Sequence, residues 1–337
     1  MIPFFLGASS GAPAPGTVFA TTLYTGNGSA RTITTGINLS TPGGLVWVKA
    51  RDGGPINHQL FDTQRGAEAR VNSNLTNAED IDPGSVTAFG TTGFNLGTAS
   101  NTNFNTRIYV AWSFARSARF FDVVTYNGSD ANAGNNYRIN HGLGITPGLV
   151  ICKRRPSTTG NAARDGWQVW HRSLSGFGHR LQLESTAAEA ATPVLTNATS
   201  TYIEFDNTLA YAKESGITYV AYLFAHDTAS DGIVQCGSYT GNGSATGPTV
   251  TLGWNPQWVM IKRATGGTGD WVIFDTARGI VAGNDPTLMA SNNAEENGVM
   301  SAADYIDLTG TGFQIASTDT NLNANTATYV YLAVRST

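Results

Sequence analysis

The stretch Ile108-Tyr-Val-Ala-Trp-Ser-Phe-Ala115 occurs in three related forms along the chain. Its counterparts are Thr218-Tyr-Val-Ala-Tyr-Leu-Phe-Ala225 and Thr328-Tyr-Val-Tyr-Leu-Ala-Val334. The second residue of each is a tyrosine, and residues 109, 219 and 329 are 110 positions apart each time. Each stretch is rich in β-branched and aromatic residues, which favours a β-strand. We therefore predict one structural unit that is present three times.

Four further markers recur in the same order ahead of this strand. They are an aromatic residue before a Gly/Asn turn, a proline before an apolar run ending in lysine, a short strand with a polar exit, and a Gly-aromatic run. In the first unit the markers lie at Tyr24–Ser29, Pro42–Lys49, Leu60–Gly66 and Thr92–Leu96. In the third unit they lie at Tyr239–Ser244, Pro256–Lys262, Ile273–Gly279 and Thr311–Ile315. The middle unit departs at Val169–Arg172 and Tyr202–Phe205, while five ordered markers still indicate a triplication.

The markers predict an all-β protein of three tandem, homologous β-sandwich domains of the jelly-roll or lectin-like kind. Short apolar runs separated by Gly, Asn and Pro turns are typical of such folds. The predicted boundaries are an N-terminal tail at 1–16 and sandwich repeats at 17–117, 118–229 and 230–337, called repeats 1, 2 and 3 below. Residues 11–16 read as an extended Pro/Gly linker. Helical turns are expected only near residues 77–82 and 292–298.

Composition supports a folded protein with an uncharged polar surface. Charged residues make up 13% of the 337 residues, whereas a typical soluble domain has about 25%. Hydrophobic residues reach 41% and aromatic residues 10%, which is ample material for a core. A surface of Thr, Ser, Asn and Gly does not favour long exposed helices.

Several classes of partner are not expected. The net charge of −4 argues against nucleic-acid binding, which needs clustered Lys and Arg. The basic clusters Lys153–Arg155 and Lys262-Arg263 end apolar runs and read as solvated strand ends. The longest apolar stretches are far shorter than the roughly 20 residues of a membrane-spanning helix, so no membrane insertion is expected. The isolated cysteines, Cys152 and Cys236, predict neither a disulfide framework nor a zinc site.

No residue pattern predicts catalysis, a cofactor or a metal. Phosphate-binding loops and nucleophile elbows are absent from the sequence. His171 and His179 share a loop-rich region without metal-ligand spacing. Asp62 and Asp275 occupy one recurring position, each followed by an arginine three residues later, which indicates a structural ion pair or turn. A glycosidase would instead need two facing carboxylates.

Two features are candidate interaction sites. Trp254 lies in a Gly-Asn-Pro turn and is the aromatic residue expected to be exposed, where it could stack on a sugar ring. Trp167 and Trp271, by contrast, are expected in the core. The apolar cluster Ile2, Phe4, Phe5 and Leu6 precedes the linker, and either docks to a partner or packs back on repeat 1.

The repeated unit resembles a domain found in virion proteins of tailed bacteriophages, often called tail-fibre or appendage proteins. The residues that carry the resemblance are the Tyr-Thr-Gly-Asn-Gly turn, the Leu-Val-Trp-Val-Lys strand, the Leu-Phe-Asp-Thr-x-Arg-Gly segment, the Thr-x-Gly-Phe-x-Leu-Gly segment and the closing Tyr-Val-Ala-Trp strand. The resemblance covers nearly the whole chain past residue 17. It implies assembly in the host cytoplasm into a phage particle and supplies no catalytic residues.

The expected function is that of a non-enzymatic structural protein of a phage particle, a tail-fibre or tail-tip protein that contributes to host-surface recognition. Expected partners are other virion proteins (tail hub, baseplate or capsid), a host surface glycan or protein, and further copies in a homo-oligomer. Two alternatives stay open, namely a capsid decoration or head-fibre protein without a receptor role, and a glycan-degrading tail enzyme. Whether the repeats surround a pseudo-threefold axis or form a row is also open.

Overall fold

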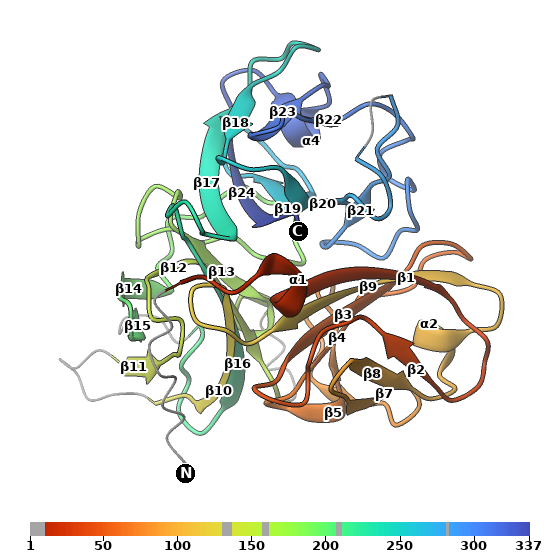
Figure 1. The fold of residues 1–337 in the computed structure, drawn as a ribbon. Helices are drawn as coiled ribbons and strands as arrows, with labels where there is room; N and C mark the ends of the chain where they lie inside the picture. The colour runs from red at the N-terminus through yellow and green to blue at the C-terminus, as the bar shows by residue number, and fades with distance from the viewer. Residues whose placement is uncertain (1–10, 130–136, 157–161, 207–210, 281–282) are drawn as a thin grey trace.

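A computed structural model describes residues 11–129, 137–156, 162–206, 211–280 and 283–337. The prediction of an all-β protein is confirmed, because six antiparallel sheets account for nearly all of the regular structure. Figure 1 shows three lobes that follow the chain from red through green to blue and meet at a common centre. Among the described residues, no helix is long and apolar enough to cross a bilayer.

Repeat 1 contains a six-stranded sheet in the order β1-β9-β3-β4-β5-β6 and a three-stranded sheet in the order β2-β8-β7. Its elements are α1 (Pro15–Val18), β1 (Phe19–Thr25), β2 (Arg31–Thr34), β3 (Gly44–Ala50), β4 (Gln59–Asp62), β5 (Gly66–Val71), β6 (Asp80–Ile81), β7 (Val86–Phe89), β8 (Gly93–Leu96), α2 (Ser100–Asn103) and β9 (Ile108–Ala115).

Repeat 2 has the corresponding sheets β10-β16-β12-β13 and β11-β15-β14. Its elements are β10 (Phe121–Asn127), β11 (Tyr137–Asn140), β12 (Pro147–Arg154), α3 (Ala162–Asp165), β13 (Gln168–His171), β14 (Leu195–Ala198), β15 (Tyr202–Phe205) and β16 (Thr218–Ala225).

Repeat 3 has the sheets β17-β24-β19-β20-β21 and β18-β23-β22. Its elements are β17 (Val234–Thr240), β18 (Thr249–Thr251), β19 (Pro256–Arg263), β20 (Trp271–Asp275), β21 (Leu288–Met289), β22 (Ile306–Leu308), β23 (Gly312–Ile315), α4 (Thr320–Asn323) and β24 (Thr328–Arg335). In all three repeats the last strand therefore lies between the first strand and the lysine-bearing strand.

The expected helical turns were misplaced. Residues 80–81 form strand β6, while the helical turns lie at the four short helices named above. One of them, α1, begins inside the predicted extended linker, because Pro15 occupies a first-turn position where its missing N–H costs nothing. Polar composition alone does not distinguish a helical turn from a loop.

A stacked tyrosine pair fixes the register of the first and last strands in every repeat. Tyr24 is paired with Tyr109 across β1 and β9, and their ring centroids are 5.1 Å apart. The equivalent pairs in repeats 2 and 3 have centroids 5.3 and 5.0 Å apart. Each pair lies at the outer end of its strands, just before the Gly/Asn turn. The recurring aromatic-turn marker is thus one side of a cross-strand contact.

The turn after the first tyrosine has room only for glycine at one position. A Cβ atom on Gly26 would lie 2.1 Å from the carbonyl oxygen of Phe104, and one on Gly241 would lie 2.2 Å from that of Ala324. Gly128 makes the same approach to the carbonyl oxygen of Glu214 at 2.1 Å. The glycine in this marker is therefore required by close backbone packing.

The cores of the three repeats are not separate. One buried cluster runs through all of repeats 1 and 2 and continues into repeat 3 through Trp258, Met260 and Val334. Its centre is the ring of Phe114, whose centroid is 4.8 Å from that of Phe19, 5.7 Å from that of Phe121, 5.5 Å from that of Phe224 and 5.8 Å from that of Trp258. A second cluster belongs to repeat 3 alone.

The two ends of the described chain meet at this centre, as Figure 1 shows for the C-terminus beside α1. A Cβ atom on Gly16 would lie 2.9 Å from Thr337 Cγ2. The linker lies on repeat 3, since the Ala12 N–H donates to Asp231 Oδ2 at 2.9 Å. Repeat 1 therefore starts where repeat 3 ends. Residues Ile2, Phe4, Phe5 and Leu6 lie outside the described residues.

We predict that Gly26→Ala and Gly241→Ala each lower the free energy of unfolding by about 2 kcal/mol or more, because the new methyl group collides with a main-chain carbonyl. Urea denaturation followed by tryptophan fluorescence measures this change. Gly178→Ala is the matched control, since a Cβ atom there meets nothing within 4 Å and no strained φ is involved. Equal losses in the free energy of unfolding for Gly178→Ala and Gly26→Ala would contradict the packing argument.

Candidate functional site

The most elaborate polar structure in the molecule lies at the contacts between repeats, which we call joints 1–2, 2–3 and 3–1. Each joint is made by one loop, the arm, reaching onto the following repeat. The arms are residues 72–79 of repeat 1, 182–189 of repeat 2 and 289–296 of repeat 3. The arm of repeat 3 contacts repeat 1, so the three joints close a ring.

The first shared contact joins a ring N–H to the carbonyl at the start of each arm. Trp167 Nε1 donates to the Asn72 carbonyl at 2.9 Å, and Trp271 Nε1 donates to the Gln182 carbonyl at 2.9 Å. In joint 3–1 the ring is His58, whose Nε2 lies 2.9 Å from the Met289 carbonyl. A histidine thus takes the place that tryptophan holds in the other two joints.

The second shared contact runs from a buried lysine of the facing repeat to the carbonyl four residues further along each arm. Lys153 Nζ donates to the Thr76 carbonyl at 3.1 Å, Lys262 Nζ to that of Thr186 at 3.0 Å, and Lys49 Nζ to that of Asn293 at 3.3 Å. The prediction that the clusters holding Lys153 and Lys262 are solvated strand ends is therefore wrong for these lysines. Their amines turn inward because each finds carbonyl acceptors on both sides of a joint.

The third shared contact is a main-chain hydrogen bond at the end of each arm. The N–H of Glu79 donates to the Arg155 carbonyl at 2.8 Å, that of Glu189 to the Ala264 carbonyl at 2.8 Å, and that of Glu296 to the Arg51 carbonyl at 3.0 Å. Three equivalent donors and acceptors in three joints mean that every arm has the same path over its neighbour.

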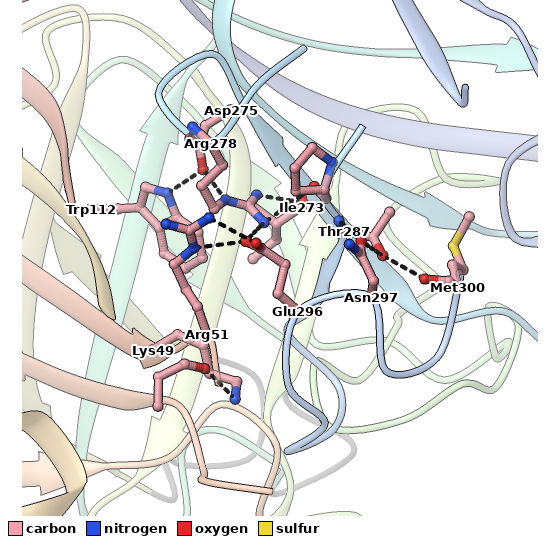
Figure 2. A network of polar contacts seen from close by, with 12 residues as sticks. Lys49, Arg51, Trp112, Ile273, Asp275, Arg278, Thr287, Glu296, Asn297 and Met300 are labelled. Atoms are coloured by element: carbon pink, nitrogen blue, oxygen red, sulfur yellow. Dashed lines mark hydrogen bonds and ion pairs between the residues drawn. The ribbon is translucent and has the colours of Figure 1, made fainter. Parts of the chain in front are cut away.

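An ion network completes joints 1–2 and 3–1. Figure 2 shows the second of these, where Arg278 bonds Asp275 through Nε at 2.6 Å and reaches Glu296 at 3.5 Å. Arg51 of repeat 1 holds the same Glu296 with two hydrogen bonds of 2.8 Å. Trp112 Nε1 donates to Asp275 Oδ2 at 3.0 Å. Joint 1–2 repeats this arrangement with Asp62, Arg65, Glu79, Arg155 and Tyr222.

Joint 2–3 lacks this network because three of its positions carry other residues. His171 stands where the other repeats have aspartate, Leu174 where they have arginine, and Ala264 where they have Arg155 and Arg51. At the aspartate position of this joint, His171 Nε2 lies 3.0 Å from the Tyr331 carbonyl of repeat 3. The remaining glutamate, Glu189, bonds Ser175 within its own repeat instead.

The predicted ion pairs of Asp62 and Asp275 with the following arginines are confirmed. Asp62 Oδ2 lies 2.5 Å from Arg65 Nε, and Asp275 Oδ2 lies 2.6 Å from Arg278 Nε, with all four side chains inaccessible to solvent. Asp62 also accepts the Gln64 and Arg65 N–H groups and the Tyr222 hydroxyl. Carboxylates engaged in this way stabilise joints rather than face a substrate.

Burial shifts the pKa of the groups in the joints. Desolvation lowers the pKa of Lys49 and Lys153 to about 8 and that of Lys262 to about 7, against the attraction of nearby carboxylates. Desolvation also lowers the pKa of His171 to about 3, and it lowers the pKa of His58 well below its ordinary value. Both histidines are therefore neutral at neutral pH.

The other sequence-predicted site residues have separate places. Trp254 is only 6% exposed, so the prediction that it is an exposed aromatic is wrong. Its side chain belongs to the buried cluster of repeat 3, which also contains Leu252 and Ile280. Trp167, Trp271 and Cys152 are buried as predicted.

Trp254 nevertheless borders an open hollow of about 830 Å³ between the linker and repeat 3. Residues 12–15, Asn255 and Arg335 line this hollow as well. Trp254 Nε1 and Asn255 Oδ1 are buried and make no hydrogen bond in the described part of the chain. A second hollow of about 510 Å³ lies along the arm of repeat 1. Within the described ranges, no cluster of three or more His, Cys, Asp and Glu side chains has the grouping of a metal site.

The fold and the joints define a class, an all-β protein whose three repeats have similar sheet orders and close on one another through matching joints. The chain belongs to the family described as domain of unknown function DUF7483, whose model matches residues 14–336. That match runs from the end of the linker to the penultimate residue of repeat 3 and so spans all three repeats. A search of the curated proteins finds no match to the chain.

We predict that Arg278→Met lowers the free energy of unfolding by about 3–5 kcal/mol, because it leaves the Asp275 and Glu296 carboxylates buried with fewer partners. Arg164→Met is the control. Arg164 also pairs with a glutamate, Glu214, but the two side chains are 42% and 27% exposed, so its removal costs at most about 1 kcal/mol. Urea denaturation compares the two, and equal losses would contradict a structural role for the buried network.

We predict that the melting temperature rises between pH 7 and 8.5. The buried lysines have folded pKa values of about 7–8 and an ordinary value of 10.5, so in this range the unfolded chain binds more protons than the folded one. Rising pH then favours the folded state. Differential scanning calorimetry of Lys262→Met should show a smaller rise than the wild type, and an unchanged slope would refute the assignment.

Proposed function

We propose that this protein is a non-enzymatic structural component of a tailed-bacteriophage particle, a tail-fibre or tail-tip protein that contributes to recognition of the host surface. The support from sequence is the resemblance of the repeats to tail-fibre and appendage domains. The observation that carries the proposal is the closed ring itself, since its recurring charged pairs are used to fasten one repeat to the next. Such a body suits a mechanical and display role.

We also infer that each repeat is a jelly-roll or lectin-like sandwich, with domain boundaries at 17–117, 118–229 and 230–337. Repeat 3 supports this inference most directly. Its own core joins Val250 and Phe313 of the small sheet to Val259 and Phe274 of the large sheet, so the two sheets pack face to face. The sheet order of repeats 1 and 2 repeats this arrangement.

The place for a host ligand within this proposal is the hollow beside Trp254. Trp254 and Asn255 line this hollow, and their indole N–H and side-chain amide oxygen have no hydrogen-bond partner among the described residues. Both atoms are buried, so a sugar hydroxyl group would have to displace part of the lining to accept from the one and donate to the other. The guanidinium of Arg335, which also lines the hollow, adds donors for an acidic sugar.

The attachment end within this proposal is the N-terminal segment. The described chain begins at the centre of the ring, on repeat 3, and the apolar residues Ile2, Phe4, Phe5 and Leu6 precede that point. A hub, baseplate or capsid partner that binds this segment would hold the ring by its centre and leave the three lobes outward. Further copies of the chain would assemble into the same particle as a homo-oligomer.

We predict that the purified protein competes with phage for adsorption to host cells, and that Asn255→Ala weakens this competition at least tenfold through loss of the amide. Arg138→Ala, on another repeat, is the control for a surface change away from the hollow. If phage still adsorb normally to host cells at saturating concentrations of the purified protein, the receptor role is refuted. A copy number in the particle that matches capsid symmetry would favour the decoration or head-fibre alternative, and release of reducing ends from host polysaccharide would favour the enzyme.

A further inference from the structure

Among the described residues, both joints of repeat 3 contain a buried histidine in addition to the contacts that all joints share, whereas joint 1–2 contains none. In joint 3–1, His58 Nε2 lies against the Met289 carbonyl, and in joint 2–3, His171 Nε2 lies against the Tyr331 carbonyl. In joint 1–2 the equivalent positions carry Trp167, which donates to the Asn72 carbonyl, and Asp62, which accepts from Tyr222. The histidines are therefore confined to the two joints of repeat 3.

The hydrogen bonds of both rings require the neutral imidazole. His58 Nε2 must donate to a carbonyl, while its Nδ1 accepts the Trp47 indole N–H at 2.8 Å. His171 Nε2 likewise donates to a carbonyl, while its Nδ1 accepts the Ser173 N–H at 3.1 Å. A second proton on either ring would go to Nδ1 and would point at an N–H group. Protonation therefore breaks the Nδ1 contact, which lies inside the ring's own repeat, and leaves the Nε2 bond to the neighbouring repeat in place. Its cost to the joint is that a cation is buried there.

The groups around the two rings add to this effect. His58 is faced by Lys49 of β3 and by Arg278 beyond β20, and it packs against Trp47 and Trp112. His171 is faced by Arg172 of its own segment and by His226 of the connection to repeat 3. All the charged or titratable neighbours named are cations or become cations in acid. Both rings are less than 2% exposed, so a proton reaches them only when the joint opens.

His226 lies at the same junction, is partly buried, and also accepts an N–H group at Nδ1. Its Nδ1 accepts the Cys236 N–H at 3.2 Å, which joins the end of repeat 2 to β17 of repeat 3. Arg172 faces it, with Asp227 as the opposing carboxylate. His141, by contrast, makes both of its ring contacts inside repeat 2, with Leu143 and Thr199. It is a natural control.

We propose that acid releases repeat 3 from the ring while repeats 1 and 2 remain joined, because His58 and His171 are buried in the two joints of repeat 3 and a proton on either ring would place a cation in a site closed to water. Release would uncover the part of repeat 3 that contributes Trp258, Met260 and Val334 to the shared core. It would also uncover the Phe114 ring on repeat 1. The acidified protein would then display an apolar surface at the centre of the molecule.

The expected size of the acid effect on the release of repeat 3 follows from proton linkage. Each histidine that takes its ordinary pKa near 6.5 in the open state raises the equilibrium constant for opening up to about tenfold per pH unit below that value. Between pH 6.5 and 4.5, two histidines raise it up to about 10⁴-fold. This range lies above the usual titration of carboxyl groups near pH 4. Glu184 is an exception because burial raises its pKa to about 6, and its proton uptake in the folded state opposes opening.

The joints contain built-in reporters, the equivalent N–H groups of Glu79, Glu189 and Glu296, one in each joint. Hydrogen–deuterium exchange of the full-length protein at pH 7.0 and 4.8, corrected for intrinsic exchange rates, measures all three at once. We expect the protection of Glu189 and Glu296 to fall at least 100-fold at pH 4.8, while that of Glu79 changes less than tenfold. Equal losses in all three joints, or loss first at Glu79, would overturn the proposal.

The variant test uses the double substitution His58→Gln and His171→Gln. A glutamine amide can donate to the same carbonyl and accept the same N–H, but it takes up no proton. We expect this variant to keep the protection of Glu189 and Glu296 at pH 4.8, while His141→Gln loses it as the wild type does. Acid sensitivity that survives the double substitution would overturn the proposal. If the double variant does not fold, the wild-type exchange pattern decides by itself, and binding of an apolar dye at pH 4.8 is the accompanying readout.

Discussion

The hydrogen bond from a buried ring N–H to the first carbonyl of the neighbouring arm is the contact on which the rest of the structure depends. Trp167, Trp271 and His58 make it in the three joints with nearly equal distances. It sets the starting point of each arm, so that the carbonyl four residues later meets the lysine of the facing repeat and the glutamate seven residues later meets its own partner. Because the contact always runs in one direction around the chain, three copies close without leaving a free end.

This closure explains why the hydrophobic core is shared. The inner ends of the long strands meet at Phe114, which touches aromatic rings from all three repeats. A repeat removed from the ring would expose both an apolar surface and the unpaired polar groups of two joints. The low content of charged residues has the same origin, because many of the charges present are buried in the joints rather than spread over the surface.

Much of this fold could be predicted from the sequence, because strands, turns and the triplication leave periodic marks. The recurring Asp62-Arg65 and Asp275-Arg278 pairs also revealed their structural role through repetition. The joints could not be predicted, since His58 and Trp167 share a function that no residue-type pattern records. One signal was available, namely that Glu79, Glu189 and Glu296 occupy matching positions in otherwise dissimilar loops. The burial of Trp254 could not be predicted, because a flanking Gly-Asn pair indicates a turn but not the direction in which the side chain between them packs.

The claim that the three repeats form a closed ring is tested most directly by a circular permutant. Thr337 is joined to Gly16 through two glycines, and new termini are placed between Ala229 and Ser230. In the ring these ends already touch, so the permutant should fold with a melting temperature within a few degrees of the unpermuted chain lacking residues 1–15. In a linear array the short link could not span the distance between repeats 1 and 3. A permutant that fails to fold, or melts far below that parent, would contradict the closed ring.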